Sequence, residues 1–183
     1  MQRILPHVSR MGTCILVVLV IFACSGTGLA QGSAKQGFRK FEGAWFDILY
    51  PRDFKVRISL FSNSSGEKKA ESAFFTSPDG TVEFYIFSPQ WSGDPRDIAL
   101  NPATEVLGDR TKSTKNGETT TMYTIKAKDG SYMRSYRDVT TESTRYVIGI
   151  KYKSKAAYNA HKARYIKFRD SLVQYADGWD GEE

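Results

Sequence analysis

Turn-forming dipeptides recur between short apolar segments of this sequence, and their spacing constrains the fold more than any other feature. Asp79-Gly80, Asn116-Gly117 and Asp129-Gly130 each separate two segments that are rich in β-branched and aromatic residues. Asn-Gly and Asp-Gly readily adopt the positive φ angles that tight hairpin turns require. The regular spacing therefore predicts an antiparallel meander of strands.

The segments between these turns have the length and composition of strands. The segment 54–61 alternates apolar and polar residues, and a period of two indicates a half-buried strand. Between Ser88 and Leu107 the chain holds three prolines, so we predict a long irregular loop there, with a short helix near 96–100. Strands are predicted at 45–50, 54–61, 72–76, 81–87, 110–114, 119–127, 131–140 and 144–152.

One long helix is predicted after the last of these strands. Ser154 is a suitable N-cap, and the larger apolar residues from Ala157 to Tyr175 gather within half of a helical wheel. We therefore predict a single α+β domain over residues 44–176, with an antiparallel β-sheet of about six to eight strands covered by this C-terminal helix. Residues 31–43 are predicted to be a linker and residues 177–183 an acidic tail.

The first thirty residues are typical of an export leader. Arg3 and Arg10 precede an uncharged run whose apolar centre spans 14–24, the length of a signal-peptide core. One interpretation is a signal peptide over 1–30, cleaved after Ala30. A second is a lipoprotein leader to residue 23 with lipidation of Cys24, and a third is an uncleaved membrane anchor. All three place the domain outside the cytoplasm, periplasmic or secreted, or membrane-anchored through Cys24.

Residue types that carry catalysis or bind metals are scarce beyond the leader. Both cysteines lie within residues 1–30, and His161 is the one histidine that follows them. This excludes thiol catalysis and cysteine-ligated metal centres for residues 31–183. The sequence also lacks a nucleophile-elbow motif and a glycine-rich phosphate loop. We therefore predict a protein that is not an enzyme and that has no cofactor or metal.

The remaining candidates for a chemical site have ordinary structural interpretations. Asp94, Asp97 and Glu105 lie in the proline-rich loop without the spacing of a calcium-binding loop, so we expect them to be solvated. His161 falls on the predicted apolar face of the helix, so we expect a packing histidine there.

A run of cations with interleaved tyrosines near the helix is the strongest sequence signal for a partner. Lys and Arg number 26 against 20 Asp and Glu, and 24 against 20 once Arg3 and Arg10 leave with the leader. Between residues 151 and 169 there is no acidic residue. A solvated helix face is the ordinary interpretation of this pattern, and contact with an envelope protein or an anionic membrane surface is the functional one; export argues against nucleic acid. The predicted contact residues are Lys151, Lys153, Lys162, Arg164 and Lys167.

A small-molecule or ion-binding pocket is the alternative function. The space between the sheet and the proline-rich loop 88–107 would be lined by Tyr85, Phe87 and Trp91.

Three short motifs resemble those of the PsbP-like fold, which is named after an extrinsic subunit of photosystem II. An aromatic strand runs into Tyr50-Pro51 and then Phe54, an Asp-Gly hairpin follows at 77–82, and a late Ser-hydrophobic step occurs at 170–173. The resemblance implies an antiparallel sheet covered by helices and a non-enzymatic accessory or scaffold protein. Together with the leader and the basic-aromatic helix, it leads us to predict an exported accessory protein of the bacterial cell envelope. The ion-binding residues of the photosynthetic member have no matching positions in this sequence.

Overall fold

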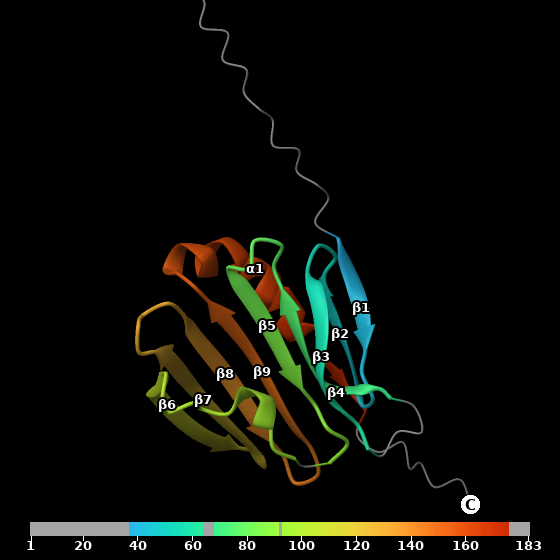
Figure 1. The fold of residues 1–183 in the computed structure, drawn as a ribbon. Helices are drawn as coiled ribbons and strands as arrows, with labels where there is room; N and C mark the ends of the chain where they lie inside the picture. The colour runs from blue at the N-terminus through green and yellow to red at the C-terminus, as the bar shows by residue number, and fades with distance from the viewer. Residues whose placement is uncertain (1–36, 64–67, 92, 176–183) are drawn as a thin grey trace, which may run out of the picture. The chain divides into compact units, whose positions relative to one another are not determined.

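A computed structural model describes residues 37–63, 68–91 and 93–175 of the chain (Figure 1). The predicted leader, Cys24 and the predicted acidic tail lie outside the described residues. Within the described ranges, no helix combines the length and the apolarity needed to cross a membrane.

The predicted α+β class is confirmed, because the described residues form two antiparallel sheets and one α-helix. The larger sheet has seven strands in the order β3-β4-β5-β9-β8-β7-β6, and the smaller has three in the order β1-β2-β10. The helix α1 spans Lys155–Asp170, and a single 3₁₀ turn, η1, spans Arg96–Ile98. The strands are β1 Phe38–Glu42, β2 Phe46–Pro51, β3 Lys55–Phe61, β4 Ala70–Thr76, β5 Val82–Phe87, β6 Glu105–Lys115, β7 Glu118–Ala127, β8 Met133–Thr140, β9 Arg145–Tyr152 and β10 Val173–Gln174.

The seven-stranded sheet has a core on each of its faces. On one face, α1 packs mainly against β2, β5 and β9, and this helix side includes the small sheet (Figure 1). On the opposite face, the loop that carries η1 covers a second core that contains Ile98 (Figure 1). Strand β5 serves both cores, with Phe84 and Ile86 on the helix side and Tyr85 and Phe87 on the loop side. This double burial explains its nearly continuous apolar sequence.

Two residues show how backbone requirements shape the sheet. The β6–β7 hairpin turns at Asn116, whose φ of 51° is followed by a φ of 79° at Gly117, as the Asn-Gly signal predicts. Gly149 lies opposite Tyr136 in the β8–β9 pairing. A Cβ at this glycine would come within 2.2 Å of the Tyr136 ring, so the ring lies over β9 because no side chain occupies that position.

The structure corrects three predicted boundaries: those of the linker, the proline-rich loop and the helix. The predicted linker 31–43 contains the strand β1, which pairs with β2 and places Phe41 against the core. Strand β6 begins at Glu105, so the irregular loop is shorter than expected.

The helix ends at Asp170 instead of continuing to Tyr175. The Ser171 hydroxyl donates to the Phe168 carbonyl and accepts from the Leu49 amide at 2.8 Å, and the next residues pair with β2 as β10. Pairing with a distant strand therefore overrides the helical pattern of the last turn.

Candidate functional site

Two adjoining cavities lie on the helix side, where β7 and β8 extend beyond α1. Their volumes are about 520 and 400 Å³, and Tyr152 and Tyr158 line both of them. Met133 belongs to the first cavity, and Ile150 and Tyr165 belong to the second. We call this combined surface the aromatic groove. A concave, largely apolar lining with a few polar groups is typical of binding sites.

The tyrosines of the aromatic groove are held by their neighbours. Tyr158 and Tyr165 are seven residues apart, so they lie two turns apart on one face of α1. The Tyr152 and Tyr158 ring centroids are 5.0 Å apart, and the Tyr152 hydroxyl donates to the Met133 sulfur at 2.9 Å. Burial raises the pKa of the Tyr165 hydroxyl, so this group remains a neutral donor. The groove is thus formed by positioned rings that are already in contact.

One end of the aromatic groove is positively charged. Lys126, Lys153 and Lys155 line its first cavity, and none of them forms an ion pair with another described residue. The first turn of α1, which begins there, contains no acidic residue. Since a helix N-terminus carries a partial positive charge, the helix adds to the field of the lysines. This end of the aromatic groove therefore favours the binding of acidic groups of a partner.

The five cations predicted as contact residues do not form one surface. Lys153 lines the aromatic groove, whereas Lys151 lies on the loop side with its ammonium 4.2 Å from the centre of the Tyr132 ring. Lys162 is exposed on α1, and Lys167 lies over the Phe38 ring at 4.3 Å.

Arg164 is buried, which corrects its predicted role in a contact surface. Its guanidinium pairs with Asp53 and stacks on the Phe54 ring, with 4.7 Å to the ring centroid. The side chain faces the same core as Phe168, one turn further along α1, so it offers no free charge to a partner.

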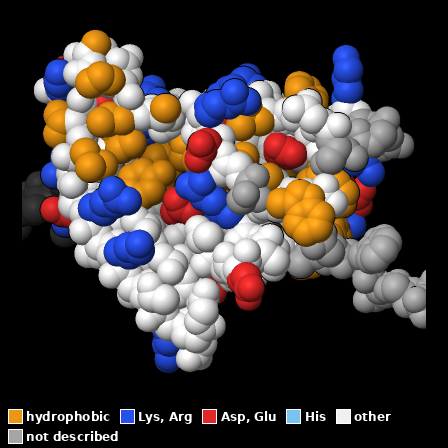
Figure 2. Space-filling model, turned by 90° about the horizontal axis from the view of Figure 1, so that it is seen from below, with side chains coloured by type: hydrophobic (Ala, Val, Ile, Leu, Met, Phe, Trp, Pro, Cys, Tyr) orange, Lys and Arg blue, Asp and Glu red, His pale blue; other side chains and the backbone are white. Residues whose placement is uncertain are grey.

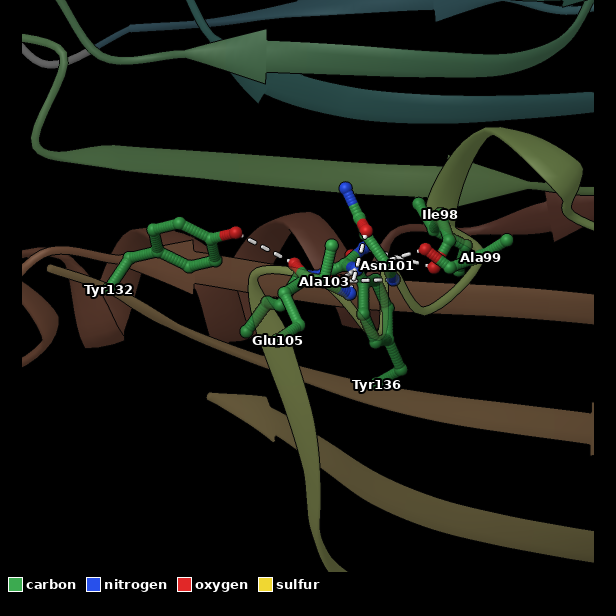
Figure 3. Close-up of polar contacts among 8 residues, drawn as sticks. Ile98, Ala99, Asn101, Ala103, Glu105, Tyr132 and Tyr136 are labelled. Carbon is green, nitrogen blue, oxygen red and sulfur yellow. Dashed lines mark hydrogen bonds and ion pairs between the residues drawn. The ribbon is translucent and has the colours of Figure 1, made fainter. Parts of the chain in front are cut away.

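A buried polar cluster on the loop side fastens the proline-rich loop to the sheet (Figure 3). The Arg134 guanidinium donates to the carbonyls of Ile98 at 2.9 Å and Ala99 at 3.1 Å, and it pairs with the Glu105 carboxylate. Glu105 also accepts from the Asn101 amide at 2.9 Å and from the Tyr132 hydroxyl at 2.7 Å. Because both charged side chains are buried, each depends on the other for compensation.

Two of the loop carboxylates that we expected to be solvated are anchors of the loop. Glu105 lies in the buried cluster. Asp97 accepts from the Ser72 hydroxyl at 2.6 Å and from the Tyr85 hydroxyl at 2.7 Å. Asp94 is exposed, as expected, and pairs with Arg145 at 3.2 Å.

Acidification is expected to weaken the contribution of Glu105 to stability. Burial alone raises the pKa of this carboxyl, but Arg134, the Asn101 amide and the Tyr132 hydroxyl outweigh burial and hold the pKa below its ordinary value of 4.5. A carboxyl with a lowered folded pKa stabilises the fold above its unfolded pKa, and the contribution is lost as the pH falls through the folded pKa. The difference in unfolding free energy between the wild type and Glu105→Gln should therefore be largest above about pH 4.5 and shrink below it.

Urea titrations at a series of pH values measure this difference. The matched control is Glu118→Gln, since the Glu118 carboxylate lies 3.6 Å from Arg137 near the surface. A difference for Glu105→Gln that stays constant from neutral to acidic pH would contradict the assignment.

The pocket predicted beside the loop is present with a different lining. Phe87 and Trp91 line a cavity of about 350 Å³ together with Phe61, but Tyr85 is buried elsewhere and bonded to Asp97. A second cavity of about 320 Å³ includes Leu100 and Leu107. Figure 2 shows hydrophobic side chains in separate patches on the lower end of the domain, with charged side chains between them.

His161 packs against Phe54 as predicted, with 5.6 Å between the ring centroids, but its buried Nδ1 has no hydrogen-bond partner within the described residues. Burial and the nearby Arg164 guanidinium lower the pKa of its imidazole. No group of three or more His, Cys, Asp or Glu that could hold a metal ion occurs in the part of the chain that the structure describes.

No protein-family model matches the sequence, and no curated protein sequence matches it. Solved structures similar to this chain include the cyanobacterial PsbP of Synechocystis, with a TM-score of 0.47 and 7% identity over 81% of this chain and 99% of that chain. A Bacteroides thetaiotaomicron protein has a TM-score of 0.40 and 18% identity over 78% and 50% of the two chains. The yeast Ran-binding protein Mog1p has a TM-score of 0.39 and 7% identity over 77% and 97%.

Proposed function

We propose that this chain is an exported, non-enzymatic binding protein of the bacterial cell envelope, and that it holds an acidic segment of another envelope protein in the aromatic groove. The observation that carries the proposal is the combination of positioned tyrosines in two adjoining cavities with lysines, in the first cavity, that form no ion pair with another described residue. Export is supported by the leader-like first thirty residues.

The tyrosines supply the affinity in this proposal. Tyrosine is enriched among the residues that dominate binding energy, because its ring buries a large area and its hydroxyl still finds a hydrogen-bond partner. Tyr152, Tyr158 and Tyr165 are half-buried, so each retains surface that a partner can cover.

The lysines supply selectivity for an acidic partner. Lys126 from β7 and Lys153 from the β9–α1 junction come from separate elements, yet they line the same cavity. Charge complementarity of this kind speeds association and suppresses wrong partners, and salt screens it. Binding through the groove should therefore weaken at high ionic strength.

Site-specific photo-cross-linking in cells tests the proposal. A photoreactive residue replaces Tyr158 in the tagged full-length chain, and the matched control places it at Ile166, which is 37% exposed on the same helix and lines none of the cavities described above. The expected result is one envelope protein, cross-linked through an acidic peptide, from position 158 alone. Lys126→Glu with Lys153→Glu should reduce that product strongly.

The same spectra show the mature N-terminus and so distinguish cleavage after Ala30 from lipidation of Cys24. Equal amounts of cross-linked product from positions 158 and 166 would contradict binding in the aromatic groove. So would a product whose yield is unchanged by the double charge reversal.

A further inference from the structure

We infer that the loop-side cavity between η1 and the strands β3, β5, β8 and β9 binds a small zwitterion of the α-amino-acid class. This cavity has a volume of about 280 Å³. Its charged lining residues are Arg57, Lys151 and Arg134 together with Glu83, Asp97 and Glu105. The inference concerns the face opposite the aromatic groove and does not depend on the proposed function.

Four of these six charged side chains have no partner of opposite charge among the described residues. Arg134 and Glu105 pair with each other. Arg57 instead lies over the Phe74 ring, at 4.2 Å from its centroid, and Lys151 lies over the Tyr132 ring at the same distance. Glu83 receives a hydroxyl from Thr76 at 3.0 Å, and Asp97 receives the two hydroxyls described above. Two cations and two carboxylates are therefore available to a ligand.

The sheet register makes the separation of these charges informative. Glu83 and Lys151 are directly opposite on neighbouring antiparallel strands, a position from which oppositely charged side chains readily pair. They do not pair, because Lys151 is directed onto Tyr132, which lies on the far side of β9 from β5. A ligand with one group of each sign satisfies both residues at once.

A buried donor in the same cavity is also without a partner. Arg134 is 8% exposed, and its Nε forms no hydrogen bond within the described ranges although its two terminal nitrogens do. Buried polar atoms are nearly always hydrogen-bonded in native proteins. The Arg134 guanidinium therefore keeps one donor without a partner among the described residues at the wall of the cavity.

The charge balance favours a zwitterion over a simple ion. The lining has three cations and three carboxylates, so a multivalent anion or cation would meet as much repulsion as attraction. The rings of Phe74, Tyr132 and Tyr136 also line the cavity and offer an apolar surface to a ligand side chain.

Isothermal titration of the full-length chain with a panel of the free standard amino acids tests the inference. The amino acid that binds most tightly is then compared with its N-acetyl derivative, which lacks the ammonium charge, and with the corresponding amine, which lacks the carboxylate. We expect each derivative to bind about tenfold more weakly or worse, since each loses one charge-assisted contact.

Arg57→Gln and Glu83→Gln are the informative variants, because neither residue is buried or ion-paired within the described residues. Each should weaken binding by about tenfold or more. The matched controls are Lys55→Gln on β3 and Glu118→Gln on β7, which do not line the cavity and should leave the dissociation constant unchanged. Circular dichroism confirms that all four variants are folded.

Three results would overturn the inference. One is that no amino acid in the panel binds. Another is that a derivative lacking one charge binds as tightly as the zwitterion. The third is that the control variants weaken binding as much as Arg57→Gln and Glu83→Gln.

Discussion

Arg134→Ala is expected to lower the free energy of unfolding by about 3–5 kcal/mol, because removing one partner of a buried ion pair leaves the other charge uncompensated. Glu105 is 5% exposed, so water cannot readily replace the lost guanidinium. The variant also frees the carbonyls of Ile98 and Ala99, to which Arg134 donates. Urea unfolding followed by circular dichroism measures the loss.

Arg137→Ala is the matched control, because Arg137 lies three residues further along β8. Its side chain is 38% exposed and pairs with Glu118 at 3.6 Å, whereas the Arg134 side chain is 10% exposed. Exposed ion pairs contribute about 1 kcal/mol or less, so the control should lose little stability. Similar losses in both variants would mean that the buried cluster does not hold the loop.

The local features of this fold could be predicted from the sequence because each depends on neighbouring residues. The Asn116-Gly117 turn requires two positive φ angles, and its own two residues supply them. The start of α1 is equally local, since the Ser154 hydroxyl accepts from the Ala157 amide at 3.1 Å. Strand positions between such turns then follow from composition.

The polar cluster could not be predicted because its members are distant in the sequence. Arg134 and Glu105 are 29 residues apart, and Glu105 follows a loop in which a carboxylate is ordinarily solvated. One signal was available. Arg134 shares a strand face with the buried Tyr136, so a charge at that position required a buried partner.

The aromatic groove was predictable in part. The sequence pattern places Tyr158 and Tyr165 on the apolar face of α1, and the structure confirms that they face the sheet. Their partial exposure depends on where β7 and β8 extend beyond the helix, which is a property of the sheet order and not of the helix. The buried position of Arg164 depends likewise on Asp53, which lies 111 residues earlier in the chain.

Phe168→Ala is expected to cost about 3–5 kcal/mol of unfolding free energy, the range for truncating a buried phenylalanine. Phe168 is fully buried, and its ring centroid lies 5.2 Å from those of Phe75 on β4 and Phe84 on β5. It is therefore the main apolar contact of the last helical turn with the large sheet. Thermal and urea unfolding measure the loss.

The control for this prediction is Ile166→Ala, on the same helix and 37% exposed. It should change stability by about 0.5 kcal/mol or less, as surface substitutions usually do.

Because the Tyr165 ring packs on the Phe84 ring, with 5.3 Å between their centroids, a shift of α1 in Phe168→Ala should also disturb the aromatic groove. Cross-linking from position 158 should then fall with Phe168→Ala and persist with Ile166→Ala. Loss of the product in both variants would show that the groove responds to the helix surface and not to its buried anchor.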